Sequence, residues 1–255
     1  MTERSATETV TGILKLTRRD AGELIDPKEA FPEGPPVRVG PQLLRRFRLP
    51  TGSAITGPVR RKGRNLELDD VESVCGLSPD EFARRTPFAD LVAVDPRERI
   101  ELSVTGDTSM RIVDLVAPIG KGTRALIVSP PKAGKTLMLE AIAHGVRQST
   151  PEARLLVLLV DERPEEVTHF RRAVQAEVFA RTNDQSPHEQ VALVDIVLAM
   201  VRTELECGRD VVVLVDSLTR VGRAYNLKGS GTRRTMSGGV EAGALEVPRR
   251  LFGLA

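Results

Sequence analysis

The sequence predicts an α/β fold in which a small N-terminal β-barrel is followed by a domain built on a mainly parallel sheet. From Thr11 to about Val74, short apolar runs are separated by turn residues such as Pro50 and Gly52, a pattern typical of an all-β barrel. From about Leu102 onward, apolar strands without alternating polar residues are interleaved with helical patterns. Such strands indicate a sheet that is covered on both faces.

The composition is that of an ordinary soluble globular protein, with 40% hydrophobic and 28% charged residues in a chain of 255. No apolar run approaches the roughly 20 residues of a membrane-spanning helix, and the N-terminus lacks the layout of a signal peptide. Cys75 and Cys207 lie far apart in the sequence, so their spacing indicates neither a disulfide framework nor a zinc site. We therefore expect a cytoplasmic protein without a membrane partner.

The N-terminal region is expected to begin with a polar tail, residues 1–10, and to form the barrel over residues 11–76. Residues 43–47 are interpreted as a single helical turn between two strands. The strands expected in the barrel are residues 12–16, 36–39, 53–56 and 66–68.

A short helix is expected over residues 78–85, because Ser78 can cap its start and Glu81 follows three residues later. We interpret residues 77–100 as a linker and residues 101–255 as the second domain. In that domain the expected strands are residues 125–128, 155–160, 176–180 and 211–215, and the expected helices are residues 135–147, 165–173 and 188–206.

Residues 129–136 read Ser-Pro-Pro-Lys-Ala-Gly-Lys-Thr between an expected strand and an expected helix. In such a phosphate loop, backbone N–H groups and the helix N-terminus converge on the phosphates of a nucleotide. Lys135 would reach the outer phosphates, and the Thr136 hydroxyl would bind Mg²⁺. Ser129 stands where the usual pattern has its first glycine, and an ordinary turn between strand and helix is the alternative.

Two further expected strands end in acidic residues, Glu162 and Asp216. Because the carboxyl ends of parallel strands lie at one sheet edge, both side chains are expected beside the phosphate loop. Asp216 would hold Mg²⁺ through water, or alternatively cap the next helix. Glu162 would orient and polarise a water molecule for attack on the γ-phosphate.

Two long stretches carry basic residues and no acidic residue, residues 34–66 and residues 217–240. Charge runs of this kind often form solvated faces. In a protein with a phosphate loop, two such stretches favour a polyanionic partner.

Four motifs together resemble the bacterial transcription termination factor Rho family. The likeness is strong over residues 85–255 and weak over residues 10–84. A fifth segment, residues 111–122, resembles the run with which the family enters its ATPase domain. The four motifs are residues 129–136, 161–167, 216–226 and 237–245.

This resemblance implies a ring-shaped homohexamer, or a mixed ring, with an OB or cold-shock-like barrel and a RecA-like ATPase core that uses ATP and Mg²⁺. It implies that Glu162 is the water-orienting base, that Arg163 senses the γ-phosphate and that Lys135 neutralises phosphate charge. Thr136 and Asp216 would hold Mg²⁺. The residues implied to contact ATP are Gly120, Lys121, Gly122, Thr123, Arg124, Ala125, Lys132, Ala133, Gly134, Lys135, Thr136, Leu137 and Arg163.

The resemblance also implies an RNA-dependent ATPase and helicase that binds nascent single-stranded RNA, acts on RNA polymerase and releases the transcript. Residues 227–238 fall where the family has a channel loop that grips RNA, and a basic loop without that role is the alternative. The implied RNA contacts are Arg234, Thr235, Ser237 and Gly238.

Two departures from the family pattern bear on these expectations. The family stacks RNA bases on aromatic side chains of its barrel, whereas residues 1–75 contain only Phe31 and Phe47, and either can be a core residue. The chain also ends within the expected ATPase domain, before the family's arginine finger, so we expect a truncated ATPase domain. A non-catalytic nucleotide-binding protein that joins or inhibits rings of a longer relative, and a subunit of a rotary or secretion ATPase, are the alternatives.

Overall fold

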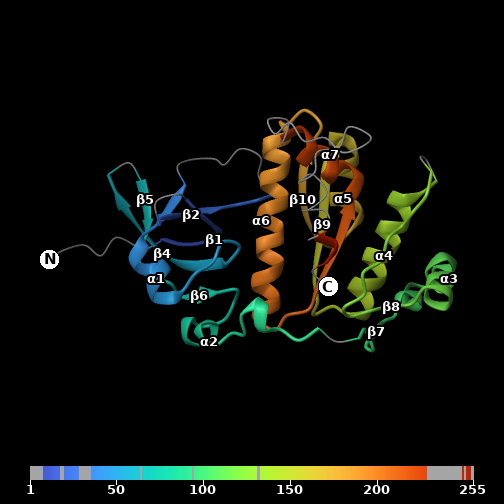
Figure 1. Ribbon diagram of the computed structural model, residues 1–255, viewed down its shortest axis with the longest axis horizontal. Coiled ribbons are helices and arrows are strands. Elements are labelled where there is room, and N and C mark those ends of the chain that lie inside the picture. The colour runs from blue at the N-terminus through green and yellow to red at the C-terminus, as the bar shows by residue number, and fades with distance from the viewer. Residues whose placement is uncertain are drawn as a thin grey trace. The chain divides into compact units, whose positions relative to one another are not determined.

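The computed structural model describes residues 8–17, 20–28, 36–63, 65–93, 95–130, 133–228, 249 and 251–253 (Figure 1). The chain divides into two compact units. The barrel unit consists of residues 1–91 and 195–209, and the sheet unit consists of residues 92–194 and 210–255. The inclusion of residues 195–209 in the barrel unit has no signal in the sequence. The expected domain boundaries stay a prediction.

The barrel unit contains the expected small β-barrel. Strand β1 pairs with both β2 and β4, so the strand order β1-β2-β3-β5-β4 closes on itself, and β6 adds to β4. The pair β3–β5 is parallel and the other pairs are antiparallel. A five-stranded closed barrel of this kind is the architecture of OB-type domains. The strands are β1 Glu8–Leu16, β2 Gly22–Ile25, β3 Val37–Val39, β4 Ala54–Lys62, β5 Asn65–Leu68 and β6 Ser73–Val74.

The four strands expected in the barrel are confirmed, whereas β2 and β6 were not among them. The expected turn at residues 43–47 is part of helix α1, Pro41–Phe47, and the expected helix after Ser78 is α2, Pro79–Ala83. The Ser78 hydroxyl accepts from the Glu81 N–H at 3.3 Å, and Glu81 accepts from the Ser78 N–H at 2.9 Å. This reciprocal capping box is the one that the spacing predicts.

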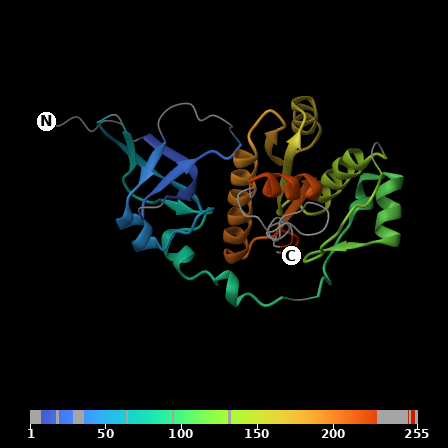
Figure 2. The same ribbon diagram turned by 45° about the horizontal axis from the view of Figure 1, so that its top comes forward.

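The sheet unit is built on three parallel strands in the order β10-β9-β11, with β9 in the centre (Figure 1, and turned in Figure 2). Three of the four strands and all three helices expected in this domain are confirmed. Among the described helices, none combines the length and the apolar character that crossing a membrane requires. The elements of the second half of the chain are β7 Arg99–Ile100, α3 Thr108–Val116, β8 Ile119–Gly120, α4 Lys135–Ser149, β9 Arg154–Glu162, α5 Pro164–Ala173, β10 Glu177–Thr182, α6 Pro187–Glu206, β11 Val211–Asp216 and α7 Leu218–Lys228.

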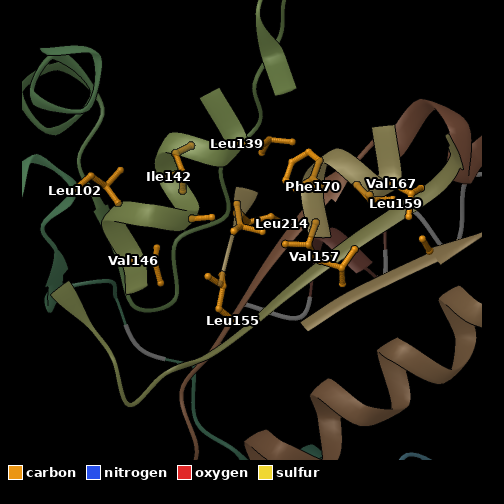
Figure 3. Packing of buried hydrophobic residues seen from close by; sticks show 14 of the residues in the cluster. Leu102, Leu139, Ile142, Val146, Leu155, Val157, Leu159, Val167, Phe170 and Leu214 are labelled. Carbon is orange, nitrogen blue, oxygen red and sulfur yellow. The ribbon is translucent and has the colours of Figure 1, made fainter. Parts of the chain in front are cut away.

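One face of the parallel sheet carries an apolar core of the sheet unit (Figure 3). Alternate side chains of β9 point to this face, because side chains along a strand alternate between the two faces. Helices α4 and α5 cover it and hold β9 in place, so the strand end that carries Glu162 rests on a packed layer. The labelled core residues of these elements are Leu139, Ile142 and Val146 of α4, Leu155, Val157 and Leu159 of β9, and Val167 and Phe170 of α5.

The strand expected at residues 125–128, directly before the phosphate loop, does not form. Leu126 is 62% exposed and Val128 is 84% exposed. Both edges of β9 are occupied by β10 and β11, and in the described part of the chain no strand pairs with the outer edge of β11. The apolar segment therefore lacks both ladder hydrogen bonds and a covering layer. Apolar composition predicted burial here, but burial also needs a pairing edge.

A buried carboxylate, Asp114, joins helix α3 to the segment before it. Its oxygens accept from the N–H groups of Leu102 at 3.3 Å and Ser103 at 2.7 Å, and Arg99 lies 3.5 Å away. Burial acts to raise the pKa of Asp114, but these hydrogen bonds and the Arg99 charge outweigh burial and lower it.

Replacing Asp114 with alanine should lower the free energy of unfolding by about 2–4 kcal/mol, because one buried and one half-buried N–H group would lose their acceptor. Urea unfolding followed by circular dichroism measures this change. Replacing the exposed Glu101 with alanine is the matched control and should have an effect within about 0.5 kcal/mol. Equal effects of the two substitutions would contradict the role given to Asp114.

Candidate nucleotide-binding site

Two carboxylates lie at the same edge of the parallel sheet. Glu162 is the last residue of β9 and Asp216 is the last residue of β11, and the two strands are adjacent and parallel. Glu162 is 3% exposed and Asp216 is 8% exposed. At the start of α7, the Ser217 hydroxyl accepts from the Arg220 N–H at 3.4 Å, so Ser217 acts as the cap. The two carboxylates therefore have the placement that the sequence predicts, whereas their roles stay predictions.

The environment of Glu162 favours its protonated form. Several effects raise the pKa of Glu162 to about 8. The largest is burial, and the second is a hydrogen bond with Glu166. The negative charges of Asp216 and Glu166 raise the pKa further. The Arg220 guanidinium, 3.2 Å from the carboxylate, opposes this rise. A carboxyl group with a pKa near neutrality, held in a sheet edge, has the property expected of a general base.

Two arginines of α7 surround the end of β9. Arg220 donates a hydrogen bond to the backbone oxygen of Asp161 in addition to its ion pair with Glu162. Arg223 lies 3.5 Å from the Asp161 carboxylate. Both belong to the acid-free stretch 217–240 that favoured a polyanionic partner. Within the described residues, these two arginines contact the chain's own carboxyl groups, so they hold the strand end in place.

The phosphate loop ends at the start of α4. Gly134 adopts φ +86°, a left-handed conformation that favours glycine, and no side chain of the described residues caps the helix. The first N–H groups of α4 are therefore available for a phosphate. Lys135 and Thr136 are half-buried in the first turn, and the Ser129 hydroxyl is buried without a hydrogen-bond partner in the described part of the chain. These groups fit a triphosphate and a hydroxyl ligand for Mg²⁺.

Comparison with known proteins places this arrangement in a family. The model of the ATP synthase alpha/beta family, nucleotide-binding domain, matches residues 109–238, half of the chain. The chain belongs to this family. Transcription termination factor Rho of Streptomyces coelicolor is 42% identical over 254 residues, which cover 99% of this chain and 60% of that protein. Rho of Pseudomonas aeruginosa is 41% identical, over 96% of this chain and 60% of that protein. The resemblance to Rho predicted from the motifs is confirmed, and the chain spans about 60% of the length of these relatives.

Solved structures show the same fold at lower identity. An ATPase from the type III secretion system of pathogenic bacteria covers 78% of this chain and aligns over 54% of its own length, with a TM-score of 0.55 and 18% identity. The ATP synthase subunit NeqB from Nanoarcheaum equitans covers 78% of this chain and aligns over 46% of its own length, with a TM-score of 0.52 and 16% identity. These likenesses confirm the α/β fold class.

Within this member of the ATP synthase alpha/beta family, the predicted nucleotide contacts at residues 120–125 form a tight turn. Thr123 closes it, because its hydroxyl accepts from the Gly120 N–H at 2.9 Å. Lys121 forms ion pairs with Asp210 at 2.7 Å and Glu98 at 2.5 Å, and these hydrogen bonds raise its pKa above the usual range. Lys121 is therefore engaged in holding the turn. Gly122, Arg124 and Ala125 are exposed.

The structure brings only some of the predicted site residues together. In the described part of the chain, no hydrogen bond or ion pair joins residues 133–137 to Glu162 or Asp216. Arg163 precedes α5 and, like Ala133, Gly134 and Leu137, is exposed. No group of three or more acidic, histidine or cysteine side chains in the described residues could hold a metal ion. Lys132 and the predicted RNA contacts Arg234, Thr235, Ser237 and Gly238 lie outside the described residues.

Sequence reasoning missed the residues that set the properties of Glu162. Glu166 lies four residues after Glu162 in the helix that follows, and Arg220 lies four residues after Asp216. Both follow a strand end by about one helical turn, a spacing that points a side chain back toward that end. This spacing is the signal by which they could have been found.

Proposed function

We propose that this chain is the nucleotide-binding part of a Rho-like, RNA-dependent ATPase and helicase that couples ATP hydrolysis to the release of nascent transcripts. The observation that carries the proposal is the buried pair Glu162 and Asp216 at one sheet edge, in a chain about 40% identical to Rho proteins. The proposal includes a ring of subunits, RNA polymerase as a partner and action in the cytoplasm.

Each site residue has a role in this proposal. Lys135 and the N-terminus of α4 bind the phosphates, and Arg163 senses the γ-phosphate. Glu162, held by Arg220 at 3.2 Å, accepts a proton from the attacking water. Thr136 and Asp216 hold Mg²⁺, which when bound offsets the negative charge of the phosphates. The residues of the turn 120–125 complete the nucleotide contacts.

Exposed basic side chains of the barrel unit support single-stranded RNA as the proposed partner. Arg38, Arg48 and Arg61 are exposed, whereas Lys62 pairs with Glu67 at 3.2 Å. Phe47 is half-buried and packs against the barrel core, as a core residue does. Binding through phosphate contacts alone weakens steeply with salt and discriminates little between bases.

Replacing Lys135 with alanine should weaken binding of MgATP by about 10- to 100-fold, because one charge-assisted hydrogen bond to phosphate contributes about 1.5–3 kcal/mol. A titration with a fluorescent ATP analogue measures the dissociation constant. Replacing the exposed Lys15 of β1 with alanine removes a lysine that the proposal leaves out and should leave binding unchanged. Wild-type affinity in the Lys135 variant would contradict the assignment of the phosphate loop.

A further inference from the structure

The two cysteines of the chain meet in the barrel unit, although 131 residues separate them in the sequence. Cys75 lies in the barrel core and is 2% exposed. Cys207 follows α6, is half-buried, and packs against the same apolar cluster that contains Cys75. Neighbouring residues along the chain also meet, because a Cβ atom added at Gly76 would lie 2.7 Å from Nη2 of Arg209. Both cysteines are free thiols.

The backbone holds Cys75 in an unusual place. Val74 and Leu77 exchange hydrogen bonds of 2.9 Å in both directions, which makes Cys75 and Gly76 the two central residues of a tight turn. Their φ angles are +49° and +72°. Turns with two positive φ angles favour glycine, asparagine and aspartate. A buried cysteine that served only to fill apolar space would not need this position, whereas this turn sets Cys75 in the cluster against which Cys207 packs.

The surroundings make the two thiols unequal. The hydrogen bond from Cys75 is the main cause that lowers the pKa of Cys207, and the charges of Arg85 and Arg209 also lower it, against burial and the charge of Glu204. The same hydrogen bond, burial and Glu204 raise the pKa of Cys75. Cys207 is therefore both the more acidic and the more exposed thiol. A reactive thiol beside a buried partner thiol is the arrangement found in cysteines that respond to oxidants.

We propose that Cys207 and Cys75 form a site of reversible oxidation, in which a peroxide converts the two thiols into a disulfide. The Cys207 thiolate attacks one peroxide oxygen, the O–O bond breaks, and the leaving hydroxide takes up a proton to become water. The Cys75 sulfur then attacks the resulting sulfenic acid of Cys207, the S–S bond forms, and the hydroxyl group leaves with the Cys75 proton as a second water. Two thiols are oxidised and one peroxide is reduced to two waters.

The disulfide would tie the turn after β6 to the residue that follows α6. Helix α6 begins at Pro187, in the sheet unit, and ends at Glu206, in the barrel unit. Because residues 195–209 belong to the barrel unit, oxidation would restrain the turn after β6 on the C-terminal part of α6 within that unit. A disulfide that closes a loop of this length without distorting the fold should raise the melting temperature by roughly 5 °C or more.

The test is treatment of the full chain with hydrogen peroxide, followed by thiol titration and non-reducing peptide mapping. The folded wild type should lose both thiols and yield one linked peptide that joins Cys75 to Cys207, at least about tenfold faster than the same chain unfolded in urea. Dithiothreitol should restore both thiols and reverse the rise in melting temperature. Persistence of both thiols, linkage only between separate chains, or equal rates in folded and unfolded chains would each overturn the proposal.

Single variants separate the two thiols, with circular dichroism to confirm folding. Replacing Cys75 with serine should stop the reaction at a sulfenic acid on Cys207, which dimedone traps. Replacing Cys207 with serine should slow oxidation of the remaining thiol by about tenfold or more. Equal reactivity of the two variants would overturn the assignment of Cys207 as the attacking thiol. The wild-type peptide map decides the proposal even where a variant does not fold.

Discussion

Replacing Glu162 with glutamine should slow ATP hydrolysis in the presence of single-stranded RNA by roughly 10²- to 10⁴-fold, the usual contribution of a positioned general base. Glutamine has nearly the shape of glutamate but cannot accept the proton of the attacking water. Affinity for MgATP should stay within about threefold of the wild type, because the phosphates bind to the loop that contains Lys135. Phosphate release and a nucleotide titration on the same samples measure the two effects separately.

The matched control for this substitution is Glu165→Gln, on an exposed glutamate in the first turn of α5. It removes the same charge one turn from the site and should leave turnover unchanged. Wild-type turnover should also rise with pH up to about 8, since only the ionised form of Glu162 accepts a proton. Turnover that survives in the Glu162 variant would contradict its role as base. A wild-type chain that binds ATP but never turns it over would favour the non-catalytic alternative.

The sequence was a good guide to the carboxylates because their placement depends on local pattern and topology alone. An apolar run that ends in an acidic residue puts Glu162 and Asp216 at strand ends, and parallel pairing brings those ends together. The closed barrel was predictable for a similar reason, since turn residues separate its strands. The pKa of Glu162 was not predictable from the sequence. It depends on how deeply Glu162 is buried at the end of β9 and on the charge of Arg220 in helix α7.

The features that the sequence did not predict share one physical cause, which is that sequence pattern does not reveal long-range contacts. Residues 125–128 have the composition of a buried strand, yet they find no pairing edge among the described strands. In the acid-free stretch 217–240, the pattern did not reveal that Arg220 and Arg223 contact Glu162 and Asp161, and the polyanionic partner stays a prediction. The spacing of Cys75 and Cys207 indicated no disulfide framework, and both are free thiols, but it did not reveal that Cys207 packs against the cluster that contains Cys75.

The ionisation of Glu162 should make the nucleotide-free protein less stable as the pH rises. The folded protein holds a proton on this carboxyl up to about pH 8, whereas the unfolded chain releases it near the ordinary value of 4.5. Between these limits the folded state binds more protons than the unfolded state, so the free energy of unfolding decreases with pH. From pH 5 to pH 7.5 this single group should lower it by about 3 kcal/mol.

Urea unfolding of wild type and Glu162→Gln at several pH values tests this expectation. Glutamine does not titrate, so the variant should gain stability relative to wild type as the pH rises through this range. Glu165→Gln should keep the wild-type slope, because Glu162 is intact in that variant. Parallel curves for wild type and the Glu162 variant would show that burial does not hold the proton. If the free energies of unfolding of the two proteins instead diverge with pH, the general base lowers the stability of the protein. The reason is that proton acceptance needs the ionised form of Glu162, and the folded sheet edge disfavours that form.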